Sequence, residues 1–166
     1  MRMSRAGFIA RFGGVYEHSP WIAEALWDKT GGEVPQTMSA LADAMAAIVA
    51  DADEAAKLKL LRAHPDLAGK AAIAGRLTRA SSEEQAGAGL DQCTKKEFAR
   101  FTALNAAYRE KFGFPFIIAV RGLDRQAILD AFAQRLANSR AAEVQTALAQ
   151  VNTIARLRLE ALEAGS

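Results

Sequence analysis

Apolar side chains recur every three or four residues along almost the whole chain, and alanine is abundant between them. This spacing gathers the apolar residues on one face of an α-helix, and alanine has the highest helix propensity. Serine, threonine or aspartate precedes most of these segments and glycine follows several, as in helix N-caps and C-caps. The pattern predicts an all-α protein. We expect a compact single-domain helical bundle of roughly eight helices over residues 1–166.

One run departs from this pattern. Phe114-Pro-Phe-Ile-Ile-Ala-Val120 is the only strongly β-branched, strand-like stretch of the sequence. It predicts one short extended buried segment at about residues 114–120. Because it has no evident sheet partner, its backbone N–H and C=O groups need other partners. They could bind the amide edges of a small ligand, or the segment could be a buried connector satisfied by side chains or water.

His64 is one of only two histidines, and Pro65 follows it directly. A residue before proline is pushed out of the α region, so the helix that starts near Asp53 is expected to end at about Ala63. His64 would then project from the helix end. An imidazole titrates close to neutral pH, which makes His64 a candidate for proton transfer. The alternative is that it only caps the helix.

Two further patterns point to positions of interest. Ser81-x-x-Glu84 and Thr94-x-x-Glu97 both match a capping box, which predicts a helix start at each. Arg158 falls on the apolar stripe of the last helix. A guanidinium on a core-facing stripe is costly unless it is paired. Arg158 therefore needs an anionic partner, either a protein carboxylate or a ligand.

The composition excludes several classes of function. The net charge of +2 is too small to indicate nucleic-acid binding, and no apolar run is long enough to span a membrane. A single cysteine, Cys93, cannot form an internal disulfide, so we expect a cytoplasmic protein. Two histidines and one cysteine, without carboxylates at ligand spacing, do not predict a metal site. Phosphate-binding loops, dinucleotide fingerprints and nucleophile elbows are absent.

Several segments together carry a resemblance to a known family. Taken in this order and spacing, they are similar to the 2-oxo-4-hydroxy-4-carboxy-5-ureidoimidazoline (OHCU) decarboxylases of urate catabolism. The similarity covers nearly the whole chain. The segments are Phe12-Gly-Gly, His18-Ser-Pro-Trp21, His64-Pro-Asp-Leu-Ala-Gly-Lys70, Ser81-x-x-Glu84-Gln85, Leu104-Asn105 with Tyr108, Phe112-Gly-Phe-Pro-Phe-Ile-Ile118 and Ala155-Arg-Leu-Arg-Leu159.

The resemblance implies a helical enzyme that uses no metal or organic cofactor, is frequently a homodimer, and forms (S)-allantoin and carbon dioxide from OHCU. From the charge and the apolar runs given above, we expect no nucleic-acid or membrane partner. Carried over to this sequence, the catalytic residues are His64 and Glu84. The implied substrate-binding positions are Pro65, Ser81, Gln85, the backbone of Phe116, Ile117 and Ile118, and Arg158.

Two other functions remain open at this point. A related enzyme acting on another ureido or hydantoin-like compound, such as an isomerase of allantoin, would use the same proton-moving groups. A non-enzymatic helical module that binds a peptide is the other. It would need a long exposed apolar stripe, and the sequence shows none beyond what a core of this size requires.

Overall fold

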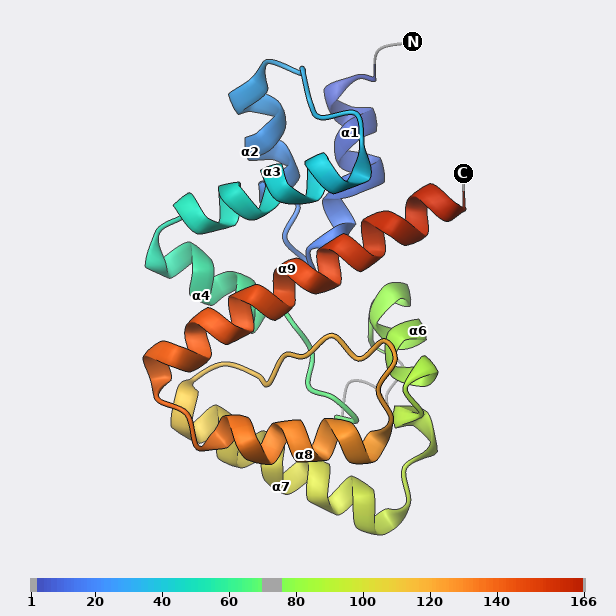
Figure 1. The fold of residues 1–166 in the computed structure, drawn as a ribbon, viewed down its shortest axis with the longest axis vertical. Coiled ribbons are helices and arrows are strands. Elements are labelled where there is room, and N and C mark those ends of the chain that lie inside the picture. The colour runs from blue at the N-terminus through green and yellow to red at the C-terminus, as the bar shows by residue number, and fades with distance from the viewer. Residues whose placement is uncertain (1–2, 70–75, 166) are drawn as a thin grey trace. The chain divides into compact units, whose positions relative to one another are not determined.

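The computed structural model describes residues 3–69 and 76–165; Lys70, the last residue of the His64–Lys70 motif, lies outside them. Within these ranges the chain forms eight α-helices, two short 3₁₀-helices and no β-strand (Figure 1). The all-α prediction is confirmed. Residue contacts divide the chain into two compact units, one of Met1–Ala63 with Val151–Ser166 and one of His64–Gln150. A single domain over residues 1–166 stays a prediction.

The first unit begins with helices whose starts follow from local capping. Ser4, Thr37 and Asp53 each accept a hydrogen bond from the backbone N–H three residues later, as expected of a serine, threonine or aspartate just before a helix. In the core of the unit, Leu41 and Met45 are at most 1% exposed. Its elements are α1 (Arg5–Phe12), η1 (Gly13–Val15), α2 (Trp21–Thr30), α3 (Met38–Asp51), α4 (Glu54–Arg62) and the part of α9 (Arg140–Ala164) from Val151 on.

The second unit is built around aromatic side chains. Tyr108 contacts the rings of Phe112, Phe114, Phe116 and Phe132, with ring centroids 4.5–5.9 Å apart. These edge and tilted contacts add to the hydrophobic burial of the rings. The elements of this unit are α6 (Arg79–Gly87), η2 (Leu90–Gln92), α7 (Lys95–Phe112), α8 (Arg125–Leu136) and α9 as far as Gln150.

The segment at residues 114–120 is extended and largely buried, as the sequence predicts. Phe114, Phe116 and Ile117 are at most 2% exposed, and no strand pairs with the segment in the described parts of the chain. It lies beside α8 (Figure 1). The Phe116 ring stacks on Phe132 of that helix, with ring centroids 3.9 Å apart. The predicted capping box of Thr94 and Glu97 at the start of α7 is present.

No helix in the described ranges has both the length and the apolar content needed to cross a bilayer.

Candidate functional site

His64 lies at the end of α4, where the sequence predicts a helix stop. The last helical residue is Arg62 and Ala63 is the C-cap, so the helix ends just before the His64–Pro65 pair. The His64 side chain is only 6% exposed. A short loop to Gly69 follows, in which Ala68 has a φ of +51°. Left-handed backbone costs an L-residue about 1–2 kcal/mol, so neighbouring contacts must hold this loop.

Helix α6 presents three of the predicted site residues on one face. Its N-cap is Thr78, whose hydroxyl accepts a hydrogen bond from the Ser81 N–H at 3.2 Å. The predicted helix start at Ser81 is therefore wrong by one turn, and Ser81 with Glu84 is not a capping box. Because the helix starts earlier, Ser81, Glu84 and Gln85 fall at i, i+3 and i+4 and share a face. Ser81 and Gln85 are buried and Glu84 is half-buried.

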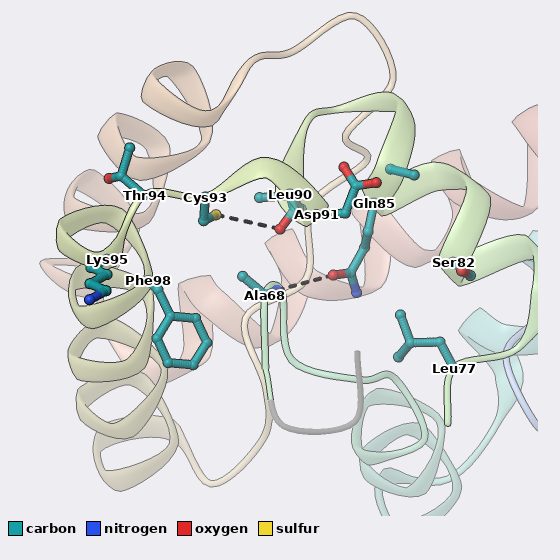
Figure 2. Close-up of a pocket in the computed structure, with 11 residues that line it drawn as sticks. Ala68, Leu77, Ser82, Gln85, Leu90, Asp91, Cys93, Thr94, Lys95 and Phe98 are labelled. Atoms are coloured by element: carbon teal, nitrogen blue, oxygen red, sulfur yellow. Dashed lines mark hydrogen bonds between the residues drawn. The ribbon is translucent and has the colours of Figure 1, made fainter. Parts of the chain in front are cut away.

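The Gln85 side chain ties α6 to the loop after His64. The Ala68 N–H donates to Gln85 Oε1 at 3.0 Å, and Gln85 Nε2 donates to the Asp66 carbonyl at 3.3 Å. Figure 2 shows the amide turned toward Ala68. Both ends of the amide are thus engaged with loop backbone. Gln85 fixes two of the three residues that precede Gly69.

Helix α7 holds the same loop from a second direction. Asn105 Nδ2 donates to the Leu67 carbonyl at 3.0 Å, and Arg109 forms an ion pair with Asp66 at 3.0 Å. Asn105 is 7% exposed, and its Oδ1 is a buried acceptor that has no hydrogen-bond partner among the described residues. Exchanging the positions of Oδ1 and Nδ2 would not remove the cost of this unpaired acceptor, because Oδ1 would then face the Leu67 carbonyl. Side chains of two helices therefore hold residues 66–68 in place.

Among the described residues, the extended segment forms hydrogen bonds with side chains and within one turn. Arg135 Nη1 donates to the Ile117 carbonyl, and the Ala119 N–H donates to Gln150 Oε1 at 2.8 Å. These two groups fit the interpretation of a connector satisfied by protein side chains. Sequence reasoning missed Arg135 and its partner Glu143. The signal was available, because Arg135 lies seven residues after Ile128 on the apolar face of α8.

Glu143 is the acid that compensates the charge of Arg135. Its side chain is fully buried, and burial by itself would raise the pKa of the carboxyl group. Hydrogen bonds from Arg135, Tyr108 and Asn138 outweigh that effect, so the pKa of Glu143 lies below its ordinary value. Burial and the bond to Glu143 raise the pKa of Tyr108. Tyr108 therefore stays protonated and donates to Glu143.

Arg158 belongs to the first unit, whereas the other predicted site residues belong to the second. It is 8% exposed, and its Nη2 lies 3.3 Å from Glu17 Oε2, a carboxylate that is itself 2% exposed. Nη1 lies 3.5 Å from the Gly14 carbonyl. The sequence requirement for an anionic partner is met by a protein carboxylate. Whether a ligand shares this guanidinium stays a prediction.

A pocket of about 460 Å³ lies on the neighbouring face of α6. Gln85 is the one predicted site residue among the described side chains that line it; His64 and Glu84 are not among them. Figure 2 shows Cys93 on its wall, with the thiol donating to the Leu90 carbonyl. Burial, followed by the charge of Glu97, raises the pKa of this thiol. In the described residues, no group of three or more His, Cys, Asp or Glu side chains could hold a metal ion.

Comparison with known proteins decides the family. A model of the OHCU decarboxylase family matches residues 1–160. The chain belongs to the OHCU decarboxylase family. This confirms the family inferred from the motifs.

Individual members of the OHCU decarboxylase family cover the chain almost completely. The OHCU decarboxylase of Halalkalicoccus jeotgali is 46% identical over 93% of this chain and 84% of its own length. That of Haloferax volcanii is 42% identical over 95% of this chain and 90% of its own length. A crystal structure of (S)-allantoin synthase is 38% identical, with a TM-score of 0.75 over 96% of this chain. This chain spans half the length of that solved chain.

Proposed function

We propose that this protein decarboxylates OHCU to (S)-allantoin and carbon dioxide. The observation that carries the proposal is the 46% identity, over 93% of the chain, to a protein named as an OHCU decarboxylase. The similarity to a solved (S)-allantoin synthase supports the same product.

The reaction needs little chemical machinery from the protein. The carboxylate of OHCU sits on a carbon next to a ring C=N bond. When carbon dioxide leaves, the bonding electron pair can move into that imine, so the substrate acts as its own electron sink. The protein must bind the anion, exclude water, orient the carboxylate and deliver one proton to one face of the resulting enol-type intermediate. Orientation and a preorganised polar environment can each contribute several kcal/mol to lowering the barrier.

In this proposal His64 moves the proton of the C4 hydroxyl, and Glu84 orients His64 or the ureido group. The burial of His64 at a helix end supports its role, because an imidazole is the usual group for proton transfer and this one is sheltered from solvent. Glu84 is half-buried on the face of α6 that also carries Ser81 and Gln85. This face supplies a carboxylate, a hydroxyl and an amide from one rigid helix.

The binding roles are proposed for the remaining positions. Pro65 would contact the ring, Ser81 and Gln85 would bind polar edges, and the backbone of residues 116–118 would bind ring or ureido amides. The two bonds of Gln85 to the loop after His64 support a further role for its amide, since they fix the backbone that follows the imidazole. Gln85 would then bind substrate with the remaining lone pair or proton of the same amide.

Arg158 is proposed to bind the anionic substrate while it stays paired with Glu17. The variant Arg158→Met tests this role. If the arginine only balances Glu17, a folded Arg158→Met protein should retain turnover. If it anchors the substrate, KM should rise about tenfold or more while the protein still melts cooperatively, since hydrogen bonds to charged groups contribute about 1.5–3 kcal/mol.

The activity can be tested directly by circular dichroism. Urate, urate oxidase and hydroxyisourate hydrolase generate OHCU in place, and the signal of (S)-allantoin is followed after this protein is added. OHCU also decays without an enzyme, so the rate is compared with a blank. Fast growth of the (S)-allantoin signal supports the proposal. Drift to racemic product at the blank rate, with folded protein, contradicts it.

Two matched pairs of variants test the catalytic residues in that assay. His64→Asn should abolish turnover, whereas His18→Asn should not, because His18 is exposed and asparagine tolerates its φ of +47°. Glu84→Gln should lower kcat by about 10²-fold or more. Glu83→Gln, one residue away and exposed, should leave kcat unchanged. Near-normal turnover by His64→Asn would end the proton-transfer proposal.

We further propose that the protein acts in the cytoplasm as a homodimer, on the basis of its resemblance to the family. Light scattering coupled to size-exclusion chromatography measures the mass in solution. A mass near the 17.8 kDa of one chain would contradict the dimer.

A further inference from the structure

A buried polar cluster connects α8 and α9 to the extended segment. Glu143 is fully buried and Arg135 is 9% exposed. Arg135 Nε donates to both oxygens of Glu143 at 3.1–3.2 Å, and Nη2 lies 2.9 Å from Oε2 without the alignment of a hydrogen bond. Asn138 and the Tyr108 hydroxyl also donate to the carboxylate. The carboxylate is therefore held by three side chains.

Stability alone does not explain such a cluster. Taking two charges out of water costs free energy that their attraction often does not return, and apolar replacements of both partners are frequently neutral or stabilising. A buried ion pair is better explained where it specifies one local conformation. The conformation in question is that of a lone extended segment, because it has no sheet ladder to define it.

Arg135 contacts the extended segment at two places, the Ile117 carbonyl of the backbone and the Phe116 ring. Nη1 donates to the Ile117 carbonyl at 2.5 Å, and the guanidinium carbon lies 4.5 Å from the centre of the Phe116 ring. The Phe116 ring in turn stacks on Phe132 of α8. Two consecutive residues of the segment are thus fixed relative to α8 by one side chain.

This contact also sets the direction of the next N–H group. The peptide bonds of the described chain are all trans, so the C=O of Ile117 and the N–H of Ile118 point in opposite directions. Since the carbonyl points to Arg135, the Ile118 N–H points away from the charged cluster. Within the described residues this N–H has no hydrogen-bond partner, although Ile118 is half-buried. The following N–H, of Ala119, is already bound by Gln150.

We propose that Arg135, held in place by Glu143, is a positioning residue that fixes the Ile117–Ile118 peptide unit and so directs the Ile118 N–H to a carbonyl oxygen of the substrate. The proposal rests on the function proposed above. OHCU and allantoin both carry ring and ureido carbonyl groups, which are the acceptors that such a donor binds. Arg135 and Glu143 themselves need not touch the substrate.

The test compares a double variant with a matched control. Arg135→Met/Glu143→Gln removes both charges together and keeps an amide oxygen for Tyr108. Arg125→Met/Glu97→Gln makes the same change at a second pair, in which Arg125 also donates to a backbone carbonyl, that of Gly89. We expect the first variant to raise KM about tenfold with kcat within about threefold of wild type. The control should lose thermal stability but keep its KM.

A direct measurement follows the Ile118 amide itself. In ¹⁵N-labelled wild-type protein titrated with (S)-allantoin, the Ile118 amide proton should shift downfield, and this shift should be lost in Arg135→Met/Glu143→Gln. A purely structural role of the pair would not remove it from a folded variant. Wild-type KM and an unchanged Ile118 shift in the folded double variant would overturn the proposal.

A second variant decides the question if the double variant does not fold. Arg135→Lys keeps the charge that balances Glu143, but offers one nitrogen in place of the fixed guanidinium fork. It should raise KM and reduce the Ile118 shift; wild-type values for both would overturn the proposal. Failure of the proposed function is seen separately, as absence of turnover by the wild-type enzyme.

Discussion

The two hydrogen bonds of Gln85 make a prediction that separates loop support from substrate binding alone. Gln85→Leu keeps a similar volume but leaves the buried Ala68 N–H without an acceptor and the Asp66 carbonyl without its donor. An unpaired buried group costs about 1–3 kcal/mol and a partly buried bond contributes about 0.5–1.5 kcal/mol. The free energy of unfolding should therefore fall by about 2–4 kcal/mol.

For a chain of this length, that loss corresponds to a melting temperature roughly 5–15 °C below wild type. Thermal melts followed by far-UV circular dichroism measure it. Gln92→Leu is the matched control, because Gln92 is exposed and its side chain makes no hydrogen bond within the described part of the chain; it should melt within about 2 °C of wild type. If Gln85 only bound substrate, Gln85→Leu would be inactive but would melt like the control.

Gln85→Glu sharpens the test through pH. A protonated glutamic acid can accept from Ala68 and donate to Asp66 as glutamine does, whereas the carboxylate faces the Asp66 carbonyl and is buried. Its folded pKa should rise above the unfolded value of about 4.3, so its stability relative to wild type is greatest below that pH and falls as pH increases. A melting difference from wild type that is independent of pH between 4 and 8 would refute the reasoning.

Three other predictions concern single residues of the second unit. Glu143→Gln should be less stable than wild type at neutral pH, and this difference in the free energy of unfolding should shrink as pH falls. The reason is that the depressed pKa of Glu143 gives stability that is present above about pH 4.3 and lost as pH falls through its folded pKa. Thermal melts between pH 3 and 7 measure the difference, and a difference that stays constant would contradict this. Cys93, whose pKa burial raises, should react with iodoacetamide more slowly than glutathione at pH 7; an equal rate would count against burial. Thr94→Ala removes the cap of α7 and should lower the melting temperature by about 2–4 °C in calorimetry, unless the helix end frays in the wild type.

Several helix starts were predictable from cap signals, although at α4 the sequence offers Asp51 as well as Asp53. Thr37, Asp53 and Asp124 each lie just before an apolar-periodic run, and each accepts the expected backbone N–H. At α6 two threonine or serine signals lie one turn apart. Thr78 and Ser81 both fit, and local chemistry does not choose between them. The observed choice allows Ser81 and Gln85 to be buried, which is a tertiary effect.

The candidate site was predictable in its residue types but not in how they are used. A glutamine that binds a ligand and one that binds a loop look the same in sequence. The partners of Gln85 are backbone groups 17 and 19 residues away, and the Leu67 carbonyl is held by Asn105 from 38 residues away. Only a folded chain identifies such acceptors. The resemblance to a family supplied candidate positions, whereas these contacts show what one of them does within the protein.

The two buried arginines show how far a physical rule can be carried on sequence alone. The cost of a charge on an apolar stripe predicted that Arg158 needs an anion, and Glu17 meets that need from 141 residues away. The same rule applies to Arg135, which shares the apolar face of Ile128 and Phe132 on α8. An arginine on such an apolar face is therefore expected to be buried. Its required partner must then be an acid on another element, and in this chain that acid is Glu143. The same guanidinium also donates, through Nη1, to the Ile117 carbonyl and so organises an extended segment that pairs with no strand in the described residues.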